Sequence, residues 1–174
     1  SEAAHRAAVA HNPMAIAFYA VARLVLAQYA DAPAQAWQAL AEAEAAVPAI
    51  SGFLASLTCV FHGALARCRA LREGLAPEPQ AERARLDAAL AELERWSAWA
   101  PSTFAHRAAL VRAECALLDG QPWQALQLYD QAAAGARASA FLHEAGLALR
   151  LAAQACSAHG MQQPVPQPRH QVAP

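Results

Sequence analysis

Prolines and glycines interrupt an otherwise alanine-rich, apolar chain at short intervals, and this pattern restricts the fold to a set of short helices. Alanine has the highest helix propensity, and apolar residues recur at helical spacing between the interruptions. Pro13 and Pro33 suit first helical turns, where the missing amide loses no hydrogen bond. Short connections favour antiparallel neighbours. The predicted helices span residues 13–30, 33–47, 51–74, 79–99, 102–118, 122–138 and 140–158.

Local residues also predict where individual helices begin and end. Ser51 can cap the start of the helix at 51–74, and Gly74 and Gly120 can adopt the left-handed conformation that ends a helix. We therefore predict an all-α domain over residues 1–160, built from three to four antiparallel hairpins. The proline-rich residues 161–174 are expected to form an extended tail, with docking into an aromatic-lined groove as the alternative.

Composition and charge argue against several classes of partner. The net charge is -1 and the 13 basic residues, all arginine, are scattered, so we expect no nucleic-acid binding. No uncharged run approaches the roughly eighteen residues of a membrane span, so we expect no membrane insertion. Four separated cysteines without a CxxC motif are expected to be buried free thiols in a reducing cytoplasm. They are Cys59, Cys68, Cys115 and Cys156.

Motifs for chemistry are absent from the sequence. Neither GxxxxGK nor GxGxxG occurs, which argues against a nucleotide cofactor. His143-Glu144 begins like a metalloprotease motif, but Leu147 stands at the position of the second histidine. His62 and His106 are interpreted as structural histidines. We therefore expect no catalytic residue, no cofactor and no metal, and we predict that this chain is not an enzyme.

The segment from residue 99 to residue 160 combines aromatic, small and acidic residues at family-like positions. These are Trp99, Pro101, Phe104, His106, Leu110, Ala113, Glu114, Gly120, Ala125, Tyr129, Ala132, Gly135, Ala136, Phe141, Glu144, Leu147, Ala148, Leu151, Ala152 and Gly160. This segment resembles the tetratricopeptide-like helical region of large bacterial signalling ATPases. In that family a Ser/Thr-kinase-like domain and a P-loop ATPase precede the helical repeats, and a GAF domain with a sensor histidine kinase often follows.

The resemblance implies that any kinase or ATPase activity lies outside this chain. The chain departs from the family at Leu149 and Arg150, which replace a polar-acidic pair. It begins without Met, and the helices expected after Gly160 are missing, so we expect a fragment of a larger array.

Two segments share the spacing of a tetratricopeptide hairpin. In that pattern a turn residue is followed by small, large and small residues at fixed intervals. The smaller residues are expected where two helices touch, and Leu40 and Tyr129 are expected to fill the groove toward the next helix. The matched positions are Asp31, Pro33, Ala36, Leu40 and Ala43 in one segment and Gly120, Pro122, Ala125, Tyr129 and Ala132 in the other.

Some side chains lead to separate expectations. We favour core packing over a ligand pocket for Trp96 and Trp99. Glu114 and Arg112 are expected to pair locally with Arg107 or Asp119, weakly and at the surface. The last helix is expected to leave an apolar face only partly covered, so the chain could self-associate or bind the missing continuation. That face would contain Phe141, Leu147 and Leu151, with Leu142 or Leu149.

Together these features predict a non-catalytic scaffold or regulatory module of a signal-transduction ATPase or sensor kinase. Its partners would be neighbouring domains of the same polypeptide or another protein. The alternative is a free-standing tetratricopeptide adaptor or secretion chaperone that grips an extended peptide. Catalytic domains in the flanking reading frame would favour the first interpretation, and stop codons at both ends would favour the second.

Overall fold

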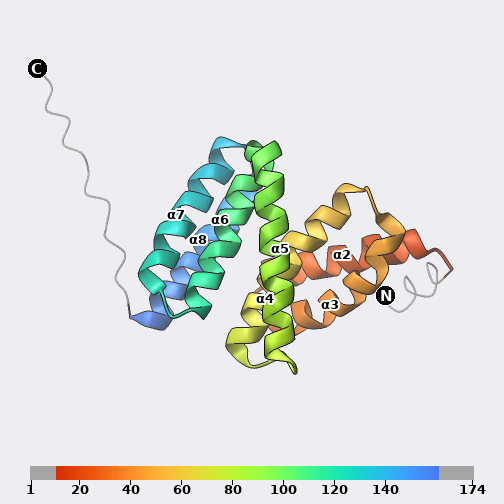
Figure 1. The fold of residues 1–174 in the computed structure, drawn as a ribbon, viewed down its shortest axis with the longest axis horizontal. Coiled ribbons are helices and arrows are strands. Elements are labelled where there is room, and N and C mark those ends of the chain that lie inside the picture. The colour runs from red at the N-terminus through yellow and green to blue at the C-terminus, as the bar shows by residue number, and fades with distance from the viewer. Residues whose placement is uncertain (1–10, 161–174) are drawn as a thin grey trace, which may run out of the picture.

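A computed structural model describes residues 11–160, and within this range the chain is helical and contains no strand (Figure 1). The all-α prediction is confirmed. The elements are α2 (Pro13–Tyr29), α3 (Pro33–Ala46), the 3₁₀ helix η1 (Val47–Ile50), α4 (Leu54–Glu73), α5 (Pro79–Trp99), α6 (Pro101–Leu118), α7 (Pro122–Ala138) and α8 (Leu142–His159). The tail predicted for 161–174 lies outside the described residues. No helix within 11–160 is long and apolar enough to cross a membrane.

The predicted helix boundaries are correct within one residue except around α4 and α8. The prediction that Ser51 caps α4 is wrong, because Phe53 precedes the first helical residue and Gly52 adopts a φ of 85° between them. The Ser51 hydroxyl instead donates to the carbonyl of Pro48, 3.1 Å away, at the end of η1. Helix α8 begins two residues later than predicted, since Ala140 has a φ of 62°.

Four connections between helices share one backbone geometry. Asp31, Gly74, Gly120 and Ala140 adopt positive φ values of 54°, 68°, 70° and 62°. The amide of the residue that follows each of them donates to the carbonyl five residues before it, at distances of 2.8–3.0 Å. This geometry satisfies carbonyl groups at the end of one helix and reverses the chain. Asp31 and Ala140 adopt it without the freedom of glycine.

The apolar residues form two separate clusters that share helix α4. One cluster joins α2, α3 and η1 to Cys59 and Ala66 of α4. The larger cluster joins Phe61 and Leu65 of α4 to α5, α6, α7 and α8. Accordingly, Figure 1 shows α2 and α3 on one side of α4 and α5, and α6, α7 and α8 on the other. Helix α4 is therefore the element through which the two halves of the molecule are packed together.

Two of the sequence predictions about apolar side chains are wrong. Trp99 is 86% exposed at the end of α5, so only Trp96 packs inward, with its ring centroid 5.3 Å from that of Phe104. On α8, Leu147 and Leu151 are buried, because this helix lies along α7 and joins the larger cluster. Leu142 and Leu149 are exposed, but the continuous uncovered face expected on α8 is absent from the described helix.

Gly135 of α7 allows a close approach to α6, whereas Gly146 of α8 faces open space. A Cβ atom at Gly135 would lie 3.2 Å from Cβ of His106, next to the α6 backbone. We expect Gly135→Ala to destabilise the fold by about 1–3 kcal/mol through overpacking. Gly146→Ala, the matched helical control, should stabilise it by about 0.5–1 kcal/mol. Urea unfolding measures both, and equal stabilisation would mean that α6 and α7 are further apart than described.

Candidate functional site

An open cleft of about 700 Å³ separates the last turns of α8 from α4 and α6. This volume falls within the range of about 300–1,000 Å³ that is usual for ligand pockets. Arg69 and Arg72 of α4 line one side, and Leu117 of α6 lines another. The facing side of α8 carries mainly small residues, which are too short to fill the space. They include Ala153, Ala155, Ser157 and Ala158.

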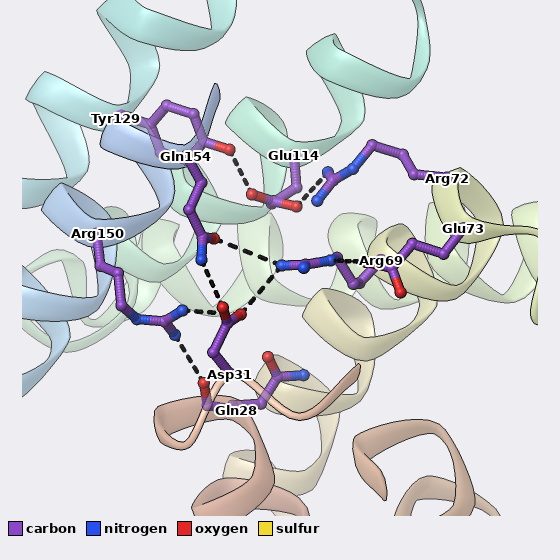
Figure 2. Close-up of polar contacts among 9 residues, drawn as sticks. All are labelled: Gln28, Asp31, Arg69, Arg72, Glu73, Glu114, Tyr129, Arg150 and Gln154. Atoms are coloured by element: carbon purple, nitrogen blue, oxygen red, sulfur yellow. Dashed lines mark hydrogen bonds and ion pairs between the residues drawn. The ribbon is translucent and has the colours of Figure 1, made fainter. Parts of the chain in front are cut away.

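The base of the cleft is a buried carboxylate held by groups from two other helices. Glu114 of α6 is 2% exposed and accepts hydrogen bonds from the hydroxyl of Tyr129 and the guanidinium of Arg72 (Figure 2). Buried charges require such partners, since an unpaired one loses several kcal/mol of solvation. The predicted local pairing of Glu114 with Arg107 is therefore wrong. Its partners lie 42 and 15 residues away along the chain.

Burial and charge also affect the ionisation of the groups around Glu114. Burial raises the pKa of Tyr129 far above its ordinary value, and the neighbouring carboxylate raises it further. Burial opposes the charge on Arg72, but Glu114 outweighs it and raises the pKa of the guanidinium. Tyr129 consequently remains a neutral hydrogen-bond donor and Arg72 a fixed cation. These two groups therefore keep their protons near neutral pH and position the carboxylate between them.

A second carboxylate, that of Asp31, lines a small crevice that adjoins the cleft on the side of α2. Asp31, in the turn between α2 and α3, lies opposite two residues of α8 and one of α4 (Figure 2). Its Oδ1 is 3.2 Å from Nη1 of Arg69 and 3.1 Å from Nη1 of Arg150, and its Oδ2 accepts from Nε2 of Gln154 at 2.8 Å. Arg150 also donates to the carbonyl of Gln28 at 2.7 Å. The contacts from α8 join residues up to 123 positions apart in the chain.

A separate buried cluster lies at the beginning of α8. The carboxylate of Glu144 accepts from Nε and Nη2 of Arg107 at 2.7–3.0 Å, and its Oε2 lies 2.6 Å from Nε2 of His106. The guanidinium carbon of Arg107 is 5.2–5.6 Å from the centroids of three phenylalanine rings. Aromatic faces attract cations electrostatically. The rings are those of Phe61, Phe104 and Phe141.

The ionisation of this cluster is set by burial and by its ion pair. Burial alone would raise the pKa of Glu144, but hydrogen bonds from His106 and Arg107 lower it to about 2. Burial lowers the pKa of His62 to about 4, and burial together with Glu144 raises the pKa of Tyr29 to about 12. At neutral pH the cluster therefore holds one ionised carboxylate, one guanidinium and a neutral His62. That combination stabilises packing between α4, α6 and α8.

The remaining candidate groups among residues 11–160 are the cysteines and His143. The four cysteines are buried free thiols, as predicted. Within the described part of the chain, no three His, Cys, Asp or Glu side chains are grouped so that they could hold a metal ion. His143 is exposed, and its Nε2 lies 3.7 Å from Glu144. The polar groups that the cleft presents are arginine, glutamine and carboxylate side chains, which form hydrogen bonds and ion pairs.

The residues selected from the sequence fall into buried packing positions, ion-paired residues and exposed residues. Gly120 is exposed in its turn, while the other selected packing positions are all buried: Ala36, Leu40, Ala43, Ala125, Tyr129 and Ala132. Among the family-like residues, Glu114 and Glu144 are ion-paired, and Trp99 and Pro101 are exposed. Phe104, Leu147, Ala148 and Leu151 are buried, and Phe141 is partly buried.

Sequence reasoning singled out Glu114, Tyr129 and Leu151 but missed Arg69, Arg72 and Gln154, which also line the cleft. Arg69 and Arg72 lie one helical turn apart, as do Arg150 and Gln154, each pair within an apolar helix. Residues at these spacings share one helix face, and this polar interruption of an apolar face was the available signal. This signal does not reveal that the polar residues of α4 and those of α8 both contact Asp31.

Comparisons with known proteins add no relative: no family model, curated protein or solved structure matches this chain.

Proposed function

We propose that this chain is a non-catalytic helical-repeat module of a bacterial signal-transduction ATPase or sensor kinase. It would hold a neighbouring domain or a protein partner. The observation that carries the proposal is the open cleft between α8 and the pair α4 and α6. The backbone geometry shared by four helix connections and the buried alanines that follow two of them, Ala36 and Ala125, support a repeat-like stack.

The side chains of the cleft suit a protein segment. Glu114, Tyr129 and Arg72 are fixed by mutual hydrogen bonds, so little side-chain entropy remains to be lost on binding. The small residues of α8 admit a peptide backbone or a helix, and Leu117 and Leu151 offer apolar contact. Pre-formed grooves of this kind bind extended or helical segments of other proteins.

Site-specific photocrosslinking in cells tests the proposal. A photoreactive amino acid replaces Ser157, which lines the cleft, and in a matched variant replaces Ser102, which is exposed at the start of α6 outside the cleft. We expect one discrete crosslinked product from position 157 and none from position 102. Equal or diffuse labelling at both positions would contradict the proposal.

The same experiment distinguishes the two kinds of scaffold. Mass spectrometry of the product from position 157 identifies the crosslinked peptide. A peptide from another domain of the same polypeptide supports the signalling-array interpretation. A peptide from a separate protein supports the alternative, a free-standing adaptor or secretion chaperone.

A further inference from the structure

Asp31 is bound by the rest of the chain in the manner of a ligand. Both of its carboxylate oxygens are contacted: Oδ1 faces the guanidinium groups of Arg69 and Arg150, and Oδ2 accepts from the amide of Gln154. The three contacting residues lie on α4 and α8, whereas Asp31 belongs to the turn between α2 and α3 (Figure 2). Charged hydrogen bonds from arginine are the usual means of recognising a carboxylate.

This carboxylate contact lies where the apolar packing is interrupted. Tyr29 of α2 packs at the edge of the cluster that contains α8, but the buried cluster of α2 and α3 is separate from it, and polar contacts hold Asp31 itself to α8. The side chains remain accessible, with 42% of Asp31, 26% of Arg69 and 30% of Arg150 exposed. Ion pairs between partly exposed side chains contribute little to the stability of a fold. Asp31 can therefore be displaced without unfolding the helices.

We propose that Arg69, Arg150 and Gln154 form a carboxylate-binding site, which Asp31 fills until an acidic peptide segment of a partner displaces it. The proposal rests on the proposed function, because it assigns a chemistry to the segment that enters the cleft. Asp31 then acts as an internal competitor that weakens the binding of weakly acidic or unrelated segments.

The positive charge of the site and its connection to the cleft favour an acidic peptide as the occupant. Removal of Asp31 leaves Arg69 with Glu73 and the side-chain oxygen of Gln154, while Arg150 keeps the carbonyl of Gln28 as an acceptor. The vacated position thus gains one unit of positive charge. The crevice around Asp31 and the cleft share Arg69, Glu114, Arg150 and Leu151 as lining residues. A peptide carboxylate bound here would place the following residues beside Leu151 in the cleft.

Two isosteric variants with the same net charge test the site. Asp31→Asn removes the competing carboxylate, and asparagine tolerates the left-handed backbone at this position. Glu92→Gln removes one negative charge from an exposed pair with Arg95 on α5. The probe is a fluorescein-labelled hexaglutamate peptide, measured by fluorescence polarisation at low salt, with a hexaglutamine peptide as the uncharged comparison.

We expect Asp31→Asn to bind hexaglutamate about tenfold more tightly than the wild type. In the wild type Asp31 occupies the site, so the peptide binds only the fraction of molecules in which the site is free. Glu92→Gln should bind like the wild type. Adding Arg150→Gln to Asp31→Asn should abolish the gain, and hexaglutamine should show none. Equal affinities for Asp31→Asn and Glu92→Gln would overturn the proposal, as would a gain that survives Arg150→Gln.

Circular dichroism melts verify that each variant is folded. If Asp31→Asn does not fold, Asp31→Gly replaces it, because glycine accepts the same backbone conformation.

The outcome of the peptide-binding experiment can be distinguished from that of the crosslinking experiment. A discrete crosslink at position 157 without the hexaglutamate gain leaves the scaffold function standing and rejects the acidic partner. The gain without a crosslink supports the carboxylate site and rejects the scaffold function.

Discussion

Replacing Glu144 with alanine is expected to lower the free energy of unfolding by about 3–5 kcal/mol, because it leaves the buried guanidinium of Arg107 without a counter-charge. Glu144 is 3% exposed and Arg107 8% exposed, and no solvent is available to replace the lost contacts. His106 loses the same acceptor. Urea unfolding followed by circular dichroism measures the change, which is a large fraction of the stability of an ordinary domain.

An exposed ion pair supplies the matched control. Glu94 accepts from Arg112 at 2.7 Å, a distance equal to the shortest contact between Arg107 and Glu144, but both side chains are at least 40% exposed. Glu94→Ala should therefore change stability by less than about 1 kcal/mol. Equal losses in the two variants would show that Glu144 is solvated and that its burial is misassigned.

A double variant separates the charge from the packing. Replacing both Arg107 and Glu144 with leucine removes the unpaired charge and keeps apolar volume among Phe61, Phe104 and Phe141. Substitution of a whole buried pair is often close to neutral, whereas loss of one member is not. We expect the double variant to recover most of the loss caused by Glu144→Ala, and a loss as large as the sum of both single changes would argue against the ion pair as the cause.

Stability is expected to fall as the pH drops from about 6.5 to about 4, owing to His62. Burial lowers the pKa of His62 from 6.5 to about 4, so in this window the unfolded chain binds a proton that the folded chain does not. The free energy of unfolding therefore rises with pH across this window, and the contribution of His62 is lost on acidification. The difference between the two pKa values corresponds to about 3 kcal/mol.

The pH profile of variants identifies the residue responsible. Glu144, Arg107 and His143 are the charged or titratable groups that act on His62. Glu144 titrates separately, because its pKa of about 2 lies below the ordinary value of 4.5, and its stabilising effect is lost only below about pH 4.5. His62→Leu should flatten the profile between pH 4 and 6.5, whereas His159→Gln, at the exposed end of α8, should leave it unchanged. A profile that His62→Leu does not alter would assign the acid sensitivity to another group.

The helices themselves are determined locally. Pro33, Pro79 and Pro122 begin helices where the sequence predicts them, since proline is compatible only with a first turn. Gly74 and Gly120 adopt positive φ and end helices because they have no side chain to clash. The sequence failed to predict the left-handed Ala140 and the 3₁₀ helix η1, because neither residue type nor spacing marks them.

The candidate sites depend on contacts that no local pattern contains. Glu114 appears in sequence as one more charge on a helix, and only the packing of α4 and α7 against α6 buries it between Arg72 and Tyr129. Asp31 appears as a turn residue, yet it is the carboxylate to which α4 and α8 direct two arginines and a glutamine.

Sequence periodicity states which face of a helix is apolar, but it does not state which other helix meets that face or at what angle. The residues of α8 illustrate both limits. Periodicity correctly marked Leu147 and Leu151 as apolar-face positions, and packing on α7 buried a face that the sequence suggested was uncovered. Further along the same helix, α8 lies beside an open cleft that its small side chains cannot fill. Helix formation follows from hydrogen bonds four residues apart, whereas the cleft and its charged rim arise from side chains up to 123 residues apart, brought together only by the tertiary packing.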